Sequence, residues 1–266
     1  MKLLAIDIGN THINIGLYAD KTYLGDWRIA TGVHRTEDEL MTYISHFISQ
    51  HQVTPDDVYT MAIASVVPNV TQIFLRLGDK YFRQNPFVID STLDLGISID
   101  YNPPEAVGAD RLCNAVAAYQ KFGGPNIIVD LGTATTLDVI SKEGVYLGGA
   151  IAPGIETAAW GLHNKAAKLP NISLEFPEKV IGKSTEASMQ AGIMIGTIEL
   201  IDGLIALIQE ELQEEAVVIA TGGLSKVLAS RSRFIKFVET HLVLDGIVRI
   251  FYRNQTGAAD NVKKNI

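Results

Sequence analysis

Residues 3–19 read LLAIDIGNTHINIGLYA, and residues 126–141 read NIIVDLGTATTLDVIS. In each stretch an apolar run is followed by Asp, one apolar residue, Gly, a small polar cluster and a second apolar run. This pattern predicts a strand, a tight turn and a second strand in both places. Each turn would present a carboxylate, hydroxyls and backbone N–H groups, so a pair of them could hold a nucleotide triphosphate and its metal between two similar lobes.

The elements around these two stretches also repeat. The first half predicts strands over residues 3–8, 12–19 and 22–30, a helix over 36–50, a strand over 61–67, a helix over 69–82 and a strand over 87–89. A polar loop over 95–107 and a helix over 110–122 complete it, and the pattern is then broken by Gly123, Gly124 and Pro125.

The second half restarts the same order after this break. It predicts strands over residues 126–131, 135–140 and 145–151, helices that begin at residues 154 and 182, a strand over 217–220 and a final helix over 243–252. The sequence therefore predicts an α/β protein built by a domain-sized duplication, with lobes at residues 1–122 and 123–266.

Composition narrows the class of protein. The 266 residues are 47% apolar, and 22 basic against 30 acidic residues give a net charge of −8. This excess of acid disfavours nucleic acid as a partner, because phosphate contacts need clustered Lys and Arg. The chain enters its first strand directly after Met1 and Lys2, and no apolar run reaches the ~18 residues of a membrane span. We expect a cytoplasmic protein with no membrane partner and, with Cys113 alone, no internal disulfide.

The first turn, Asp7-Ile8-Gly9-Asn10-Thr11, has the residue types of a phosphate site. Gly9 permits a close backbone approach, the N–H groups around it can form an anion-binding concavity, and Asp7 is a candidate Mg²⁺ ligand because hard cations prefer oxygen. A polar hairpin turn without a ligand is the plain alternative. The second copy, Asp130 to Thr136, adds three hydroxyls at the matching point of the second half, which favours the ligand interpretation.

Gly108-Ala109-Asp110-Arg111 stands at the start of a predicted helix. Asp110 could be a general base that accepts the proton of an alcohol attacking a γ-phosphate, and Arg111 could clamp a carboxylate or phosphate. The structural alternatives are that Asp110 caps the helix and that Arg111 forms a surface ion pair. Two nucleotide-binding motifs are absent, since the chain contains no G-x-x-x-x-G-K-[ST] and no G-x-G-x-x-G after a strand.

Taken together, several short motifs resemble type III pantothenate kinase, a family of the acetate and sugar kinase, heat-shock chaperone and actin superfamily. The motifs are DIGNT (7–11), YNPPEAVGADR (101–111), DLGTATT (130–136), GGAIAPG (148–154), GKST (182–185), MQAG (189–192) and ATGG (220–223). Their order and spacing over nearly the whole chain make the resemblance specific. It implies two ribonuclease-H-like lobes, mixed sheets flanked by helices, with a cleft between them, and ATP-dependent phosphorylation of pantothenate in the first step of coenzyme A biosynthesis.

The resemblance also implies roles for single residues. Asp110 would be the general base, and Asp130 would hold a monovalent cation, K⁺ or NH₄⁺. The ATP phosphates would be lined by Asp7, Ile8, Gly9, Asn10, Thr11, His12, Ile13 and Asn14, with Thr133 also touching ATP. Pantothenate would be contacted by Tyr101, Gly108, Ala109, Asp110, Arg111 and Thr185. The family is homodimeric. His12 and Ile13 depart from many relatives, which backbone contacts tolerate.

Two rival functions remain open from the sequence. One is another phosphotransferase of the same superfamily, such as a sugar kinase, because the fold alone does not separate these. The other is a nucleotide-binding regulator without catalysis. That second function would need a missing base or cation ligand, whereas Asp110 and Asp130 are both present.

Overall fold

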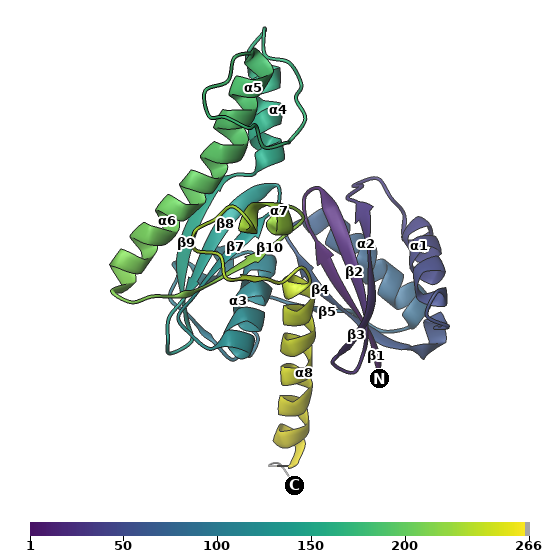
Figure 1. The fold of residues 1–266 in the computed structure, drawn as a ribbon. Helices are drawn as coiled ribbons and strands as arrows, with labels where there is room; N and C mark the ends of the chain where they lie inside the picture. Colours follow the sequence, from purple (N-terminus) through teal and green to yellow (C-terminus); the bar gives the residue numbers. More distant parts are fainter. Residues whose placement is uncertain (264–266) are drawn as a thin grey trace. The chain divides into compact units, whose positions relative to one another are not determined.

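The computed structural model describes residues 1–263, with side chains described through Gln255. Its internal contacts divide the chain into two compact units (Figure 1). Unit 1 comprises Met1–Gln120 and the chain from His241 through the last helix, and unit 2 comprises Lys121–Thr240. Each unit is described by itself.

Unit 1 is built on a five-stranded mixed sheet. Its strands are β1 (Lys2–Ile8), β2 (His12–Ala19), β3 (Thr22–Ala30), β4 (Val58–Ser65) and β5 (Phe87–Val88). β1, β2 and β3 form an antiparallel meander, whereas β4 pairs parallel to β1 and β5 parallel to β4, so that the order is β3-β2-β1-β4-β5. β1 is apolar on both faces and is buried almost throughout, as a strand covered from both sides should be.

The helices α1 (Glu37–Ser49) and α2 (Pro68–Leu77) pack against this sheet and share one hydrophobic core with it. The helix predicted over 36–50 is confirmed, and Thr36 caps it, because its hydroxyl accepts a hydrogen bond from the backbone N–H of Glu39 at 3.2 Å. Leu40, Ile44 and Phe74 pack with the strand residues in one cluster of buried apolar side chains. The predicted helix over 69–82 is divided, since α2 is followed by a short π-helix, η2 (Gly78–Phe82).

Two further helices of unit 1 pack against each other. They are α3 (Ala109–Phe122), of which unit 1 holds the part through Gln120, and α8 (Leu242–Lys263). They touch where a Cβ on Gly246 would lie 2.0 Å from the carbonyl oxygen of Cys113. Cys113 is fully buried. α8 also packs on β1 and β4, so the chain from His241 groups with unit 1, whereas the sequence-based boundary assigned it to the second lobe.

Three short elements complete unit 1. They are η1 (Pro55–Asp57), β6 (Ser98–Ile99) and η3 (Pro104–Ala106). The last two lie within the stretch that the sequence predicts as a loop.

Unit 2 repeats the sheet of unit 1. Its strands are β7 (Asn126–Leu131), β8 (Ala134–Ile140), β9 (Val145–Pro153), β10 (Val217–Thr221) and β11 (Phe237–Val238). β7, β8 and β9 form an antiparallel meander, and β10 and β11 follow in parallel on the other side of β7. From the last strand of the meander onward, unit 2 has the order β9-β8-β7-β10-β11, and unit 1 has the equivalent order β3-β2-β1-β4-β5. This repeat of the strand order confirms the predicted duplication and fold class.

The helices of unit 2 are α4 (Ile155–Lys165), α5 (Thr185–Gln190), the π-helix η4 (Ala191–Ile195), α6 (Gly196–Leu212) and α7 (Ser225–Ala229). α5, η4 and α6 form one long helical stretch, and α4 and α5 lie beyond the sheet of the unit at its far end (Figure 1). This stretch, Thr185–Leu212, is long and apolar enough to cross a membrane by length and composition alone. A core helix passes the same test, and Ile193, Ile198 and Ile205 belong to the buried cluster of unit 2.

Candidate active site

The first predicted turn joins β1 to β2 in unit 1. The backbone N–H of Gly9 donates to the carbonyl of His12 at 3.0 Å, and the carbonyl of Gly9 accepts from the Thr31 hydroxyl at 2.7 Å. Asp7 and Asn14 face each other across the two strands, and the Asn14 amide donates to the Asp7 carboxylate at 2.9 Å. The turn is therefore held by its own strands and by Thr31, and the carboxylate of Asp7 is fixed in orientation.

Asp110 lies at the same end of this sheet. A Cβ on Gly108 would lie 2.5 Å from Oδ1 of Asp110 and 3.3 Å from Cγ1 of Val66, and the backbone N–H of Val66 donates to the carbonyl of Ile8 at 3.1 Å. The end of β1, the end of β4 and the start of α3 thus converge. Gly108 is required here because any side chain would displace the Asp110 carboxylate.

The electrostatics of Cys113 agree with this convergence. Burial raises the pKa of the Cys113 thiol, and the negative charges of Asp7 and Asp110 raise it further, so both carboxylates lie near it. The thiol is a neutral core group and not a nucleophile.

Asp110 itself is largely shielded from water. Burial raises the pKa of its carboxyl group above the ordinary value, while the hydrogen bond from the Arg111 backbone N–H, at 2.8 Å, and the Arg111 charge act in the opposite direction. A carboxylate with a raised pKa accepts protons more readily, as a general base should. The same hydrogen bond also satisfies one of the free backbone N–H groups in the first turn of α3, so this geometry is compatible with both a catalytic and a helix-stabilising role of Asp110.

The second predicted turn joins β7 to β8 in unit 2 and has the same architecture. The backbone N–H of Gly132 donates to the carbonyl of Ala134 at 3.0 Å. The carbonyl of Thr133 accepts from the backbone N–H of Gly154 at 3.2 Å and from the Thr157 hydroxyl at 2.6 Å. A threonine that follows the third strand of the meander therefore bonds a carbonyl of the turn in each unit.

Two glycines pack against this second turn. A Cβ on Gly154 would lie 2.2 Å from the carbonyl oxygen of Gly132, and one on Gly222 would lie 2.8 Å from Oδ1 of Asp130 and 2.6 Å from the carbonyl oxygen of Leu131. Gly222 also has φ of +89°, which few other residues adopt. The absence of a side chain at Gly222 keeps one side of the Asp130 carboxylate uncovered by that loop.

A wide pocket of about 1290 Å³ opens in unit 2 beside this turn. Thr157 lines it while donating to the carbonyl of Thr133, and Thr185 lines it together with Lys183 and Ser188. Thr185 is the first residue of α5, whose cap Ser184 accepts a hydrogen bond from the backbone N–H of Ala187 at 3.1 Å. Substrate-sized molecules fit in pockets of this scale.

The predicted residues thus fall into two groups. Unit 1 holds the turn from Asp7 to Asn14, the stretch from Gly108 to Arg111, and Tyr101, which is half-buried just before η3. Unit 2 holds Asp130, Thr133 and Thr185. Within the described residues, no group of three or more His, Cys, Asp or Glu side chains is arranged as a metal site.

Sequence reasoning missed the supporting residues Thr31 and Thr157. Each is a threonine shortly after the third strand of its meander. This correspondence can be recognised only when the two halves of the sequence are aligned element by element. The sequence contains the glycine motifs GGAIAPG and ATGG, but it does not predict that they contact the second turn.

Comparison with known proteins identifies the family of the chain. A family model described as type III pantothenate kinase matches residues 3–207. Curated proteins of that name are similar over nearly the whole chain. The one from Paramagnetospirillum magneticum is 43% identical over 96% of this chain and 98% of its own length. Those from Listeria monocytogenes and Roseiflexus sp. are 40% and 41% identical, over 95% and 96% of this chain and 98% and 100% of their own lengths.

Solved structures of kinases share the fold at low sequence identity. An inorganic polyphosphate/ATP-glucomannokinase from Arthrobacter sp. aligns with a TM-score of 0.51 at 15% identity, covering 95% of this chain and 99% of that one. A ROK hexokinase from Thermus thermophilus aligns with a TM-score of 0.52 at 12% identity, covering 98% of this chain and 100% of that one. These two likenesses support the two-lobed fold only.

Proposed function

Because the chain belongs to the type III pantothenate kinase family, we propose that it transfers the γ-phosphoryl group of ATP to the primary alcohol of pantothenate. The product would be 4'-phosphopantothenate, and the reaction would be the first step of coenzyme A biosynthesis. The observation that carries the proposal is in unit 1, where the Asp7 turn and the half-buried Asp110 carboxylate converge at one end of one sheet.

Asp110 would accept the proton of the attacking alcohol. Its carboxylate is shielded from water, and its raised pKa brings its proton affinity closer to what a general base needs at neutral pH. Phosphoryl transfer otherwise depends mainly on positioning and on neutralising charge. Arg111, which follows Asp110 on α3, would bind the carboxylate of pantothenate through its guanidinium.

ATP would be held by the backbone and side chains of Asp7 to Asn14 and by Thr133. The hydrogen bonds of Gly9 with His12 and Thr31 give this turn a fixed shape before any ligand arrives. Mg²⁺ suits the site, since it binds through one or two carboxylates together with substrate phosphates, and Asp7 supplies an oriented carboxylate. When bound, the metal would neutralise charge on the phosphates.

Asp130 would hold a monovalent cation, K⁺ or NH₄⁺. Gly222 brings no side chain against its carboxylate, and the Leu131 carbonyl oxygen lies, like Oδ1 of Asp130, next to Gly222. A protein of net charge −8 that brings carboxylates, ATP and an anionic substrate together needs such cations to limit repulsion.

Pantothenate would be contacted by Tyr101, by Gly108 to Arg111 and by Thr185. The pocket that Thr185 lines supports this assignment, because Thr157 links its wall directly to the Thr133 carbonyl. The adjoining surface of unit 2 exposes large apolar residues on β9, α4, α6 and the loop before α5, among them Ile151 (64% exposed), Trp160 (65%) and Ile181 (81%). Such a surface favours a homodimer whose subunit contact lies near the pantothenate pocket.

We place the enzyme in the cytoplasm and expect no nucleic acid or membrane partner. The net charge of −8 gives nucleic acid little to bind. The apolar helical stretch Thr185–Leu212 is accounted for by its packing in the core of unit 2 and by the proposed dimer surface.

A coupled assay of ADP release tests the activity against its rivals. ATP is offered with pantothenate and, separately, with a panel of hexoses. Turnover that depends on pantothenate is expected; turnover with a hexose instead would point to another phosphotransferase of the superfamily. ATP binding without turnover of either would support the regulator.

A further inference from the structure

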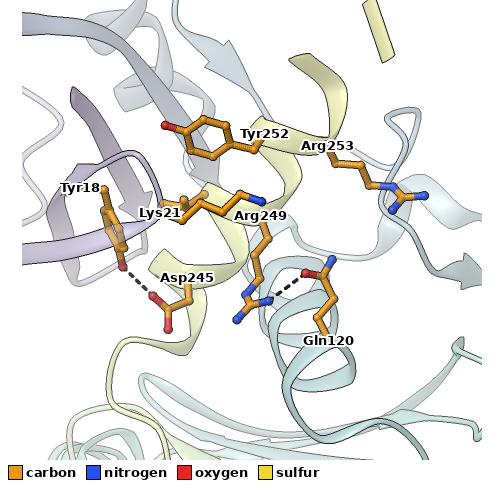
Figure 2. Close-up of a pocket in the computed structure, with 8 residues that line it drawn as sticks. Tyr18, Lys21, Gln120, Asp245, Arg249, Tyr252 and Arg253 are labelled. Atoms are coloured by element: carbon orange, nitrogen blue, oxygen red, sulfur yellow. Dashed lines mark hydrogen bonds between the residues drawn. The ribbon is translucent and has the colours of Figure 1, made fainter. Parts of the chain in front are cut away.

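Unit 1 contains a second cavity that the proposed reaction does not use. It has a volume of about 620 Å³ and is lined by residues at the end of β2, at the end of α3 and along one face of α8 (Figure 2). Tyr18 in its wall pairs with Leu3, near the start of β1, whereas Asp7 stands near the end of that strand. At a rise of about 3.3 Å per residue, the cavity is about 13 Å along the sheet from the Asp7 turn.

Positive charge is concentrated at this cavity. Lys21, Arg249 and Arg253 line it against one carboxylate, that of Asp245, in a chain of net charge −8. Arg253 is neutralised by Asp94 at 2.7 Å. The other two cations have only uncharged partners among the residues that the structure describes: Arg249 donates to the Gln120 amide oxygen at 2.9 Å, and the Lys21 ammonium lies 5.6 Å from the centre of the Tyr252 ring.

The carboxylate in the wall already has a hydrogen-bond donor. The Tyr18 hydroxyl donates to Oδ1 of Asp245 at 2.9 Å, and burial keeps the pKa of this tyrosine above its ordinary value, so that the donor proton stays in place. Lys21 and Arg249 line the same cavity, and Figure 2 draws their side chains between Tyr18 and Gln120. Lys21 and Arg249 thus share the cavity with one carboxylate that neither of them pairs with, and the excess positive charge would be neutralised by an anion.

We propose that this cavity binds a small phosphorylated metabolite, with its phosphate between Lys21 and Arg249. The phosphate would displace the Arg249–Gln120 hydrogen bond in favour of charge-assisted ones, which are stronger. Tyr18 and Val248 would contact the organic part, and Asp245 would accept from a hydroxyl or amine on it. The volume is in the usual range for such ligands.

The test measures binding of glycerol 3-phosphate by calorimetry with the ATP site filled by a non-hydrolysable ATP analogue and Mg²⁺. One further site is expected in the wild type. Lys21→Gln and Arg249→Gln should each weaken its affinity about tenfold, the usual effect of losing a hydrogen bond to a charged group. Lys236→Gln, which removes an exposed lysine of unit 2, is the matched control and should bind as the wild type does.

Three outcomes would overturn the proposal. They are no further site in the wild type, equal affinity in all three variants, and equal binding of succinate, which would show that any anion suffices. Lys21 is exposed in the turn after β2, so Lys21→Gln tests the idea even if Arg249→Gln disturbs α8. Kinase activity is not the readout, so failure here leaves the proposed reaction untouched.

Discussion

Gly154→Ala should displace the second turn, because Gly154 packs against the backbone of that turn. The new Cβ would lie 2.2 Å from the Gly132 carbonyl oxygen and 2.6 Å from that of Thr133, and real Cβ atoms stay at least 3.0 Å from such atoms. The turn must therefore move by at least 0.8 Å, the difference between 3.0 and 2.2 Å, or α4 must move away from it. Because both contacts are to backbone, no side-chain rotation relieves them.

We expect a cost of about 1–3 kcal/mol in the free energy of unfolding, as for other overpacked sites. We also expect kcat/KM for ATP to fall roughly 10- to 100-fold, since a displacement near 1 Å is enough to misplace reacting groups. Urea denaturation and initial rates of ADP release with pantothenate measure the two effects.

Gly161→Ala, within the helix α4 that Gly154 precedes, is the control. Nothing lies within 4 Å of its Cβ position, so alanine there should stabilise α4 by about 0.5–1 kcal/mol. Because Gly161 lines the pocket assigned to pantothenate, the rate compared is kcat/KM for ATP at saturating pantothenate, which should be unchanged. Wild-type activity in Gly154→Ala would refute the placement of Gly154 against the turn. An equal loss of kcat/KM for ATP in Gly161→Ala would show that the effect comes from a general change in α4 and not from the contact of residue 154 with the turn.

Four other predictions follow from the two units. Asp110→Asn should lower kcat about 100- to 10,000-fold while ATP binding persists, and a loss of stability in place of activity would support the cap interpretation. Burial raises the pKa of Asp110, so the folded state holds this proton more tightly than the unfolded state. The free energy of unfolding therefore falls as the pH rises through the folded-state pKa. Asp110→Asn should melt at a higher temperature than the wild type at pH 7 but not at acid pH, unlike the exposed control Asp79→Asn. Replacing K⁺ by Na⁺ should slow phosphopantothenate formation in the wild type, and Asp130→Asn should remove that difference; equal rates in both salts would exclude the cation site. Trp160→Glu should convert a dimer to a monomer in sedimentation, and a monomeric wild type would contradict the proposed interface.

Local pattern was sufficient to predict most elements of the fold. The two Asp-x-Gly turns, the meanders around them and the Thr36 cap of α1 all depend on residues close in sequence, where periodicity and capping rules apply. The position of Asp110 at the start of a helix was predictable for the same reason, and α3 begins at Ala109.

The place of α8 could not be predicted in this way. Its assignment to unit 1 depends on Gly246 meeting Cys113 and on packing against β1, contacts between residues more than 100 positions apart. Nor could the end of the helix be predicted, because the apolar pattern stops at Tyr252 and predicts a helix over 243–252, whereas the helix continues to Lys263. Side-chain chemistry indicates which face of such a helix is apolar but not which sheet it covers.

The two turns share a pattern, yet their registers differ by one residue, and this difference gives a physical basis for the proposal that their carboxylates hold different cations. Asp7 pairs across its hairpin with Asn14, seven positions on, whereas Asp130 pairs with Thr136, six positions on. In the first turn the partner's amide donates to the carboxylate and fixes its orientation, as a site for a divalent ion with strict geometry requires. In the second turn the Thr136 hydroxyl donates instead to Asp138, at 3.1 Å, and the Asp130 carboxylate faces the side-chain-free Gly222. Asn14→Thr, which introduces the second turn's residue into the first, should therefore weaken Mg²⁺ dependence without altering the response to K⁺, and a change in both would show that the two carboxylates do not act separately.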